Sequence, residues 1–198
     1  RDCLLSDFPL LLVGPGKYSI TVTISTSDSP QPEIDQPAIE ELADILNGRQ
    51  KRVVAVESCT GGMVAAYLTS ISGSSEWFEG AFVTYRLSAK TRMVGVSDSM
   101  LEKHGAVSEP TARAMAEGGL RHSDADFSVA ITGVAGPAGG DPVTPVGTVW
   151  FAWAMRTPEI RCVQTIQHHF DGDRDAVRIQ AVNLAVAGLL ELLEADER

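Results

Sequence analysis

The sequence predicts an α/β fold of three layers (α/β/α), built on a mixed, mainly parallel sheet with an antiparallel hairpin near the C-terminus. From residue 37 onwards, short runs of β-branched and small apolar residues alternate with segments of helical spacing, which is typical of strand–helix–strand units. Two strand patterns, at residues 147–154 and 161–170, follow each other without a helix and therefore predict the hairpin. With 44% hydrophobic residues in a chain of 198, the composition suits one domain with a full core.

The first half of this pattern predicts three helices and two strands. A helix is expected over residues 37–48, because a proline begins it, apolar residues recur at three- and four-residue steps, and a glycine ends it. The run Val-Val-Ala-Val at residues 53–56 predicts a buried strand, and a helix follows it over residues 61–72. A second strand is expected at residues 78–85, and one or two helical turns at residues 88–94.

The second half continues the alternation. Ser108 is a candidate N-cap for a helix that runs to about residue 119. The apolar run at residues 127–132 predicts another core strand, and it ends at a glycine-rich loop over residues 133–140. After the hairpin, apolar residues on one face of residues 175–194 predict the closing helix.

Residues 1–36 are predicted to be an N-terminal extension and linker without chemistry, and residues 37–198 to form the domain. Residues 18–24 alternate between apolar and hydroxyl side chains like an edge strand, whereas residues 25–36 are rich in Ser, Pro, Asp and Gln, which is typical of a linker. The apolar run at residues 10–13 lacks the basic flank and cleavage site of a signal peptide.

Charge and composition argue against several classes of partner and of structural site. The net charge of −10, without any basic run, argues against nucleic acid, because the overall field repels phosphate. No segment is expected to be long and apolar enough to cross a membrane. The three cysteines, Cys3, Cys59 and Cys162, are widely spaced, so neither a disulfide framework nor a zinc site is predicted. We therefore expect a cytoplasmic globular protein.

The segment Glu57-Ser58-Cys59-Thr60-Gly61-Gly62 follows the first strand and opens a helix. Such a strand–turn–helix places Ser58 or Cys59 at the carboxyl end of a strand, where the backbone N–H groups of residues 60–62 would stabilise an oxyanion. An ordinary N-capped helix, with Ser58 or Thr60 as the cap, explains the pattern equally well. Cys59 is an alternative nucleophile, but we expect it to face the core.

A serine nucleophile needs a base, and the four histidines do not suit the role. His168 and His169 point to opposite faces of a strand, and His104 and His122 lie near helix ends. Lysine is another known partner of serine, and Lys90 follows Tyr85 by five residues, just beyond the second strand. To act as a base at neutral pH, Lys90 needs a pKa lowered from about 10.4 to about 7–8.

The glycine-rich loop at residues 133–140 is expected to line the same crevice, because ligands of open α/β sheets bind at the carboxyl ends of strands. It matches neither G-x-G-x-x-G nor a P-loop. Two interpretations stay open: backbone N–H groups that hold a nucleotide phosphate, or a plain tight turn stabilised by Pro137.

These motifs occur in a specific order along most of the chain. They comprise Glu57 to Gly62, Gly80 to Tyr85 with Ala89-Lys90, Gly105 to Glu109, Ile131 to Pro137 with Gly139-Gly140, Pro145 to Val149, and Phe170 to Arg174 with Val177-Arg178. In this order they resemble the C-terminal domain of the competence/damage-inducible protein CinA, in its stand-alone form. Active members of that family are nicotinamide mononucleotide amidohydrolases (deamidases). The family departs from this sequence at Arg86-Leu87, where Ser-Asn is usual, and at Thr144, often lysine.

Position by position, the resemblance implies Ser58 as nucleophile, Lys90 as base and Tyr85 as an assisting group. The residues predicted to bind substrate belong to the glycine-rich segments: Thr60, Gly61, Gly62, Thr132, Gly133, Ala135, Gly136, Gly139 and Gly140. The implied reaction is hydrolysis of the carboxamide to nicotinic acid mononucleotide and ammonia, on a small-molecule nucleotide substrate, without metal or cofactor. A homo-oligomer is expected, with a dimer favoured.

Two other functions stay open at this point. One is an amidase for another small amide, and the other is a non-catalytic nucleotide-binding or protein-interaction module of the same fold. The presence of Ser58, Tyr85 and Lys90 together favours an enzyme.

Overall fold

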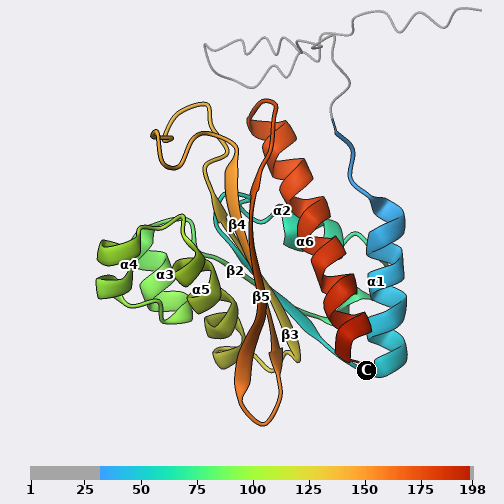
Figure 1. The fold of residues 1–198 in the computed structure, drawn as a ribbon. Helices are drawn as coiled ribbons and strands as arrows, with labels where there is room; N and C mark the ends of the chain where they lie inside the picture. Colours follow the sequence, from blue (N-terminus) through green and yellow to red (C-terminus); the bar gives the residue numbers. More distant parts are fainter. Residues whose placement is uncertain (1–31, 197–198) are drawn as a thin grey trace, which may run out of the picture. The chain divides into compact units, whose positions relative to one another are not determined.

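The computed structural model describes residues 32–196, apart from the side chains at positions 162 and 163. Their centre is a five-stranded sheet with the strand order β2-β1-β3-β4-β5 (Figure 1). The strands are β1 (Val53–Glu57), β2 (Phe78–Val83), β3 (Phe127–Gly133), β4 (Thr148–Arg156) and β5 (Ile160–His169).

The pairing of the strands confirms the predicted mixed sheet and hairpin. β1 pairs in parallel with β2 on one side and with β3 on the other, so that Val56 lies opposite both Phe82 and Ala130. β3 pairs antiparallel with β4, and β4 with β5. Because β1 connects forward to β2 on one side while β3 lies on the other, the carboxyl end of β1 is where an open α/β sheet binds ligands.

Helices cover both faces of the sheet, which confirms the three predicted layers. One face carries α1 (Gln36–Arg49), α2 (Met63–Leu68) and α6 (Arg174–Asp196), and the other carries α3 (Leu87–Val94), α4 (Asp98–His104) and α5 (Glu109–Arg121) (Figure 1). A single 3₁₀ turn, η1 (Ser74–Glu76), precedes β2.

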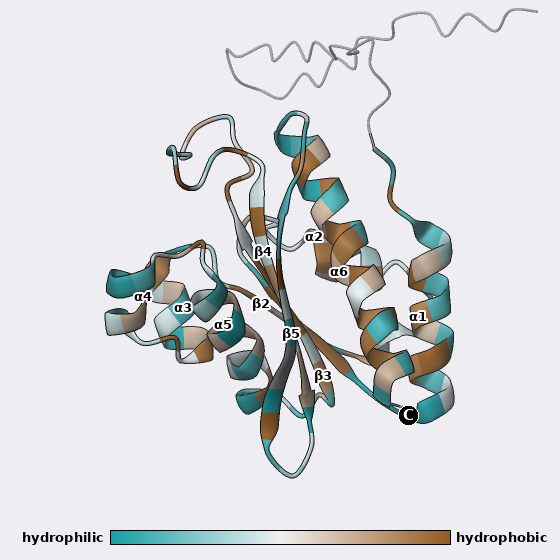
Figure 2. Cartoon of the chain, viewed as in Figure 1, coloured by the Kyte–Doolittle hydropathy of each residue, from teal (hydrophilic) through white to brown (hydrophobic). Residues whose placement is uncertain are grey.

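The central strand β1 is buried on both faces, because its side chains alternate between two apolar clusters. Val53 and Ala55 belong to the cluster under α1 and α6, and Val54 and Val56 to the cluster under α5. Figure 2 shows the apolar faces of these helices turned toward the sheet. A residue at the end of β1 is therefore held by packing from both sides.

Two helix ends and one unpredicted helix are the main differences from the sequence prediction. α1 continues past Gly48, and Gln50 takes the left-handed conformation (φ 52°) that ends the helix. α2 ends at Leu68, because the hydroxyls of Thr69 and Ser70 donate to carbonyl groups of the preceding turn and compete with helix continuation. The helix α4 was not predicted, although Ser97 caps it by accepting a hydrogen bond from Met100 N.

The described fold begins before the predicted boundary at residue 37. Asp35 accepts a hydrogen bond from Ala38 N as the N-cap of α1. Asn183 of α6 accepts from Asp35 N at 3.0 Å and donates to the Glu33 carbonyl at 2.8 Å. These bonds join residues 33–35 to the domain. The rest of the predicted extension, including the alternating pattern at residues 18–24, lies outside the described residues.

One helix corrects the expectation about membrane-crossing segments. By length and composition alone, α6 could span a membrane, since it has 23 residues and a window of mean hydropathy 1.5. Ten of its residues are buried in the domain, and it packs against β3 and β4. The apolar residues of α6 are therefore those of a core helix, which buries them against the rest of the domain.

Candidate active site

Ser58 is the first residue after β1. Its backbone N–H donates to the Ile131 carbonyl of β3 at 2.9 Å, so the sheet ladder continues through the serine and fixes its backbone. The side chain is only 8% exposed. The parallel strands thus deliver the hydroxyl to the carboxyl edge of the sheet, as the strand–turn–helix pattern predicts.

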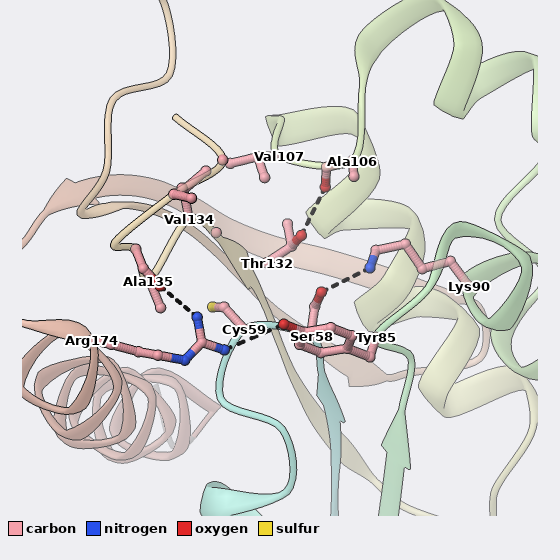
Figure 3. Close-up of a pocket in the computed structure, with 14 residues that line it drawn as sticks. Ser58, Cys59, Tyr85, Lys90, Ala106, Val107, Thr132, Val134, Ala135 and Arg174 are labelled. Atoms are coloured by element: carbon pink, nitrogen blue, oxygen red, sulfur yellow. Dashed lines mark hydrogen bonds between the residues drawn. The ribbon is translucent and has the colours of Figure 1, made fainter. Parts of the chain in front are cut away.

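Lys90 lies in α3 and reaches Ser58 through the protein interior (Figure 3). Its Nζ lies 2.9 Å from Ser58 Oγ and 2.7 Å from the Thr84 carbonyl oxygen, and the residue has no exposed surface. Burial disfavours the ammonium form and lowers the Lys90 pKa from 10.5 to about 8. A lysine that acts as a base at neutral pH requires a pKa of this size.

Cys59 occupies a different environment from its neighbour. It belongs to the apolar cluster between the sheet and the α1/α6 layer, and burial raises the pKa of its thiol to about 12. The thiolate is therefore unavailable at neutral pH. Cys59 also lines the cavity, and the backbone N–H groups of Cys59 and Thr60 lower the thiol pKa against the larger effect of burial.

Arg174 lies on the side of Ser58 away from Lys90 and contacts the Tyr85 hydroxyl (Figure 3). Arg174 Nη2 donates to the Tyr85 hydroxyl at 3.3 Å, and Nη1 donates to the Gly136 carbonyl at 2.6 Å. Tyr85 is 58% exposed. Its hydroxyl has no hydrogen bond to Ser58 or Lys90 within the described part of the chain, and the residue lines the cavity described next.

These side chains surround a cavity of about 260 Å³. It is lined by Ser58, Cys59, Tyr85, Lys90, Ala106, Val107, Thr132, Gly133, Val134, Ala135, Gly136, Ala138, Gly139 and Arg174. The lining combines the end of β1, the segment after β2, the start of α6 and the glycine-rich loop. The loop at residues 133–140 therefore reaches the cavity, whereas the segment after β1 reaches it through Ser58 and Cys59 and not through its glycines.

Among the residues predicted to bind substrate, five line the cavity, namely Thr132, Gly133, Ala135, Gly136 and Gly139. The other four do not line it, namely Thr60, Gly61, Gly62 and Gly140. The Thr132 hydroxyl donates to the Ala106 carbonyl at 2.7 Å, which joins the end of β3 to the segment before α5. No histidine of the described residues lines this cavity, and no group of three metal-ligating side chains gathers within residues 32–196.

The predicted oxyanion hole at residues 60–62 needs a correction. Gly61 N donates to the Ser58 carbonyl, and Gly62 N donates to Glu57 Oε2 at 2.9 Å. The same carboxylate also accepts hydrogen bonds from Val64 N and Ala65 N, so these backbone N–H groups at the start of α2 already have partners. The amides of Gly61 and Gly62 are thus engaged inside the protein and do not face the cavity.

Sequence reasoning left two residues of this site without a role. Arg174 and Arg178 belong to one of the segments that carry the resemblance, yet of the two only Arg174 lines the cavity, while Arg178 donates to Asp175 and to the Thr60 carbonyl. Glu57 was named only as the first residue of the segment that contains Ser58. Its signal was a charged residue at the end of a strand pattern that is otherwise wholly apolar, which predicts a buried carboxylate with dedicated donors.

Known proteins resemble this chain over most of its length. A model of the CinA C-terminal domain family matches residues 35–193. The nicotinamide-nucleotide amidohydrolase PncC of Escherichia coli (strain K12) is 49% identical over 150 residues, which are 76% of this chain and 89% of that protein. The protein of the same name from Pseudomonas putida is 46% identical over 151 residues, which are 76% of this chain and 92% of that protein.

Solved structures show the same fold. The crystal structure of the competence-damaged protein (CinA) superfamily protein from Escherichia coli has a TM-score of 0.74 at 38% identity, and the match covers 86% of this chain and 94% of that one. The competence damage-inducible protein A from Klebsiella pneumoniae has a TM-score of 0.76 at 36% identity over 82% of this chain and 98% of that one. The chain therefore belongs to the CinA C-terminal domain family.

Proposed function

We propose that this chain is an amidohydrolase that converts nicotinamide mononucleotide to nicotinic acid mononucleotide and ammonia. The observation that carries the proposal is the 2.9 Å contact between Lys90 Nζ and Ser58 Oγ, made by two buried side chains at the edge of a cavity. The substrate class is supported by the name of the relatives, nicotinamide-nucleotide amidohydrolase.

The buried lysine supplies the base in this proposal. With a pKa of about 8, roughly one Lys90 side chain in ten is neutral at pH 7, against about one in 3,000 at 10.5. The neutral amine donates a hydrogen bond to the Thr84 carbonyl, which turns the nitrogen lone pair toward the Ser58 hydroxyl. The fixed carbonyl therefore orients the base, as a third group does in catalytic triads.

The first half of the reaction forms an acyl-enzyme. Ser58 Oγ attacks the carboxamide carbon while its proton passes to Lys90, which gives a tetrahedral intermediate with a negatively charged oxygen. The Lys90 ammonium then gives a proton to the amide nitrogen, the C–N bond breaks and ammonia leaves. An ester of Ser58 remains, and Lys90 is neutral again.

Water completes the cycle through the same two groups. Lys90 takes a proton from the attacking water, and the second tetrahedral intermediate expels Ser58 Oγ, which recovers its proton from Lys90. The product is the pyridine carboxylate. For the oxyanion of both intermediates we assign the backbone N–H group of Cys59, because it follows Ser58 directly and Cys59 lines the cavity.

Arg174 is assigned to bind the substrate phosphate, and Tyr85 is assigned to position the substrate. The net charge of −10 makes a local cation necessary for an anionic ligand, and Arg174 is the guanidinium that lines the cavity among the described residues. Because Tyr85 contacts Arg174 and not Ser58, its assisting role is to position the substrate. Its aromatic ring also offers a surface on which a pyridine can stack.

The decisive experiment measures ammonia and nicotinic acid mononucleotide released from nicotinamide mononucleotide by the purified protein. Turnover that disappears in Ser58→Ala supports the proposal. A protein that binds the nucleotide without turnover would instead be a binding module, and turnover restricted to other amides would assign a different amidase. The family resemblance further supports a cytoplasmic homo-oligomer, with a dimer favoured, which light scattering of the same preparation tests.

A further inference from the structure

Glu57 is a fully buried carboxylate directly before the proposed nucleophile. It is the last residue of β1 and has no exposed surface. Its oxygens accept hydrogen bonds from Gly62 N at 2.9 Å, Val64 N at 3.2 Å and Ala65 N at 2.9 Å. All three partners are N–H donors, which is the arrangement that an ionised carboxylate requires in the interior.

The side chain of Glu57 closes the turn that contains Ser58. It reaches forward over residues 58–61 to amides five, seven and eight positions ahead. Gly61 and Gly62, with φ values of 61° and 99°, adopt the left-handed conformation that this tight path needs. The Ser58 backbone is therefore held on one side by β3 and on the other by the turn that Glu57 ties down.

The backbone of the same residue holds the segment that orients the base. The Glu57 carbonyl accepts hydrogen bonds from Thr84 N at 2.7 Å and from Thr84 Oγ1 at 3.3 Å. Thr84 is fully buried, and its own carbonyl accepts from Lys90 Nζ at 2.7 Å. One residue thus connects to Ser58 through the chain and to Lys90 through Thr84.

We propose that Glu57 is a positioning residue, which sets the separation and orientation of Ser58 and Lys90 through its side-chain bonds to the α2 amides and its carbonyl bonds to Thr84. The inference rests on the proposed function, since it assumes that these two residues carry the chemistry. It also explains why the amides at the start of α2 are closed to a substrate anion: the protein's own carboxylate fills them.

Glu57→Gln and Glu57→Asp test this role. Gln keeps the size of the side chain but replaces one acceptor oxygen by an NH₂ group that faces a backbone donor. We expect kcat for nicotinamide mononucleotide to fall by about a hundredfold, since a misplacement of about 1 Å has an effect of that order, with KM changed less than about threefold. Asp keeps the charge, and we expect it to recover about tenfold of the lost kcat.

A matched control separates positioning from stability. Asp35→Ala removes the N-cap of α1, a carboxylate that likewise accepts from a helix amide but lies outside the cavity lining. It should lower Tm while leaving kcat unchanged. If Glu57→Gln keeps kcat within about threefold of the wild type while its Tm falls, Glu57 is a helix cap only and the inference is wrong. If Glu57→Gln does not fold, a normal kcat in Glu57→Asp overturns it equally.

Failure of the proposed function would be recognised separately. If the wild-type protein does not hydrolyse nicotinamide mononucleotide, the proposed substrate is wrong. The role of Glu57 is then tested by a measurement that does not depend on the substrate. That measurement is the rate at which phenylmethylsulfonyl fluoride sulfonylates Ser58, with loss of fluoride, followed by mass spectrometry. A rate that is lower in Glu57→Gln than in the wild type and Asp35→Ala supports positioning. Equal rates, or no reaction at Ser58 in any of these proteins, overturn it.

Discussion

Arg174 Nη2 donates a hydrogen bond to the Tyr85 hydroxyl at 3.3 Å, so a guanidinium at the start of α6 and a phenol after β2 meet beside the cavity. The two residues are 89 positions apart in the chain. Lys90 lies on the other side of Ser58 (Figure 3). The cavity therefore separates a side suited to proton transfer from a side suited to an anionic substrate group.

This arrangement predicts that the substrate phosphate contributes to turnover. Nicotinamide mononucleotide should have a kcat/KM about ten- to a hundredfold above that of nicotinamide riboside, since one charge-assisted contact is worth roughly 1.5–3 kcal/mol. Arg174→Ala should remove most of that difference by lowering kcat/KM for the mononucleotide alone. The surface variant Arg121→Ala is the control. Equal kcat/KM values for both substrates in the wild type would contradict a phosphate subsite.

The identity of the nucleophile is tested by substitution of two neighbouring residues. Ser58→Ala should abolish turnover and leave the circular dichroism spectrum unchanged, because it removes one hydroxyl and little packing. Cys59→Ala should stay active, with a Tm lowered by the loss of a buried side chain. An active serine variant together with an inactive cysteine variant would show that the thiol is the nucleophile.

The role of Lys90 as a base predicts that a substitution which keeps its positive charge still abolishes turnover. Lys90→Arg keeps the positive charge but provides no neutral amine, so it should be nearly as inactive as Lys90→Ala. Circular dichroism must show that both variants fold, because Lys90 is buried. Near wild-type turnover in the arginine variant would mean that the residue supplies only a charge.

The lowered pKa of Lys90 also predicts a pH profile. The active form is the neutral amine, so kcat/KM should rise with pH and level off above a pKa of about 8. Ser58→Ala should show no residual profile of this shape. A rate that is flat between pH 6 and pH 9 would contradict proton transfer to Lys90.

The lowered pKa of Lys90 also means that this residue destabilises the folded protein at neutral pH. Its folded pKa of about 8 lies below the unfolded value of 10.5, so the unfolded state binds more protons between these values, and stability should rise with pH through this window. Below pH 8 the penalty is constant, of the order of 3 kcal/mol. Lys90→Met should therefore raise Tm at pH 7 while abolishing turnover. The gain should shrink from pH 8 to pH 10.5, and a Tm lowered at every pH would contradict this account.

The sequence by itself determined the layers, the strands and the candidate residues of the site, and those inferences depend on short-range patterns. Periodicity reports which face of a segment is buried, and the position of Ser58 after an apolar run reports the end of a strand. The family resemblance then selected Tyr85 and Lys90. The shorter α2 and the missed α4 were errors of boundaries, where side-chain bonds to the backbone decide the outcome.

Only the tertiary structure decided which groups meet. β2 pairs with β1 in a register that sets Glu57 opposite Val83, so Thr84 and the chain to Lys90 lie beside Ser58. The turn at the start of α6 brings Arg174 to Tyr85, and the buried Glu57 takes the amides that the sequence had assigned to an oxyanion. The contacts between β1 and β2 and between Arg174 and Tyr85 join segments far apart in the chain, and they depend on strand register and packing, which no local pattern contains.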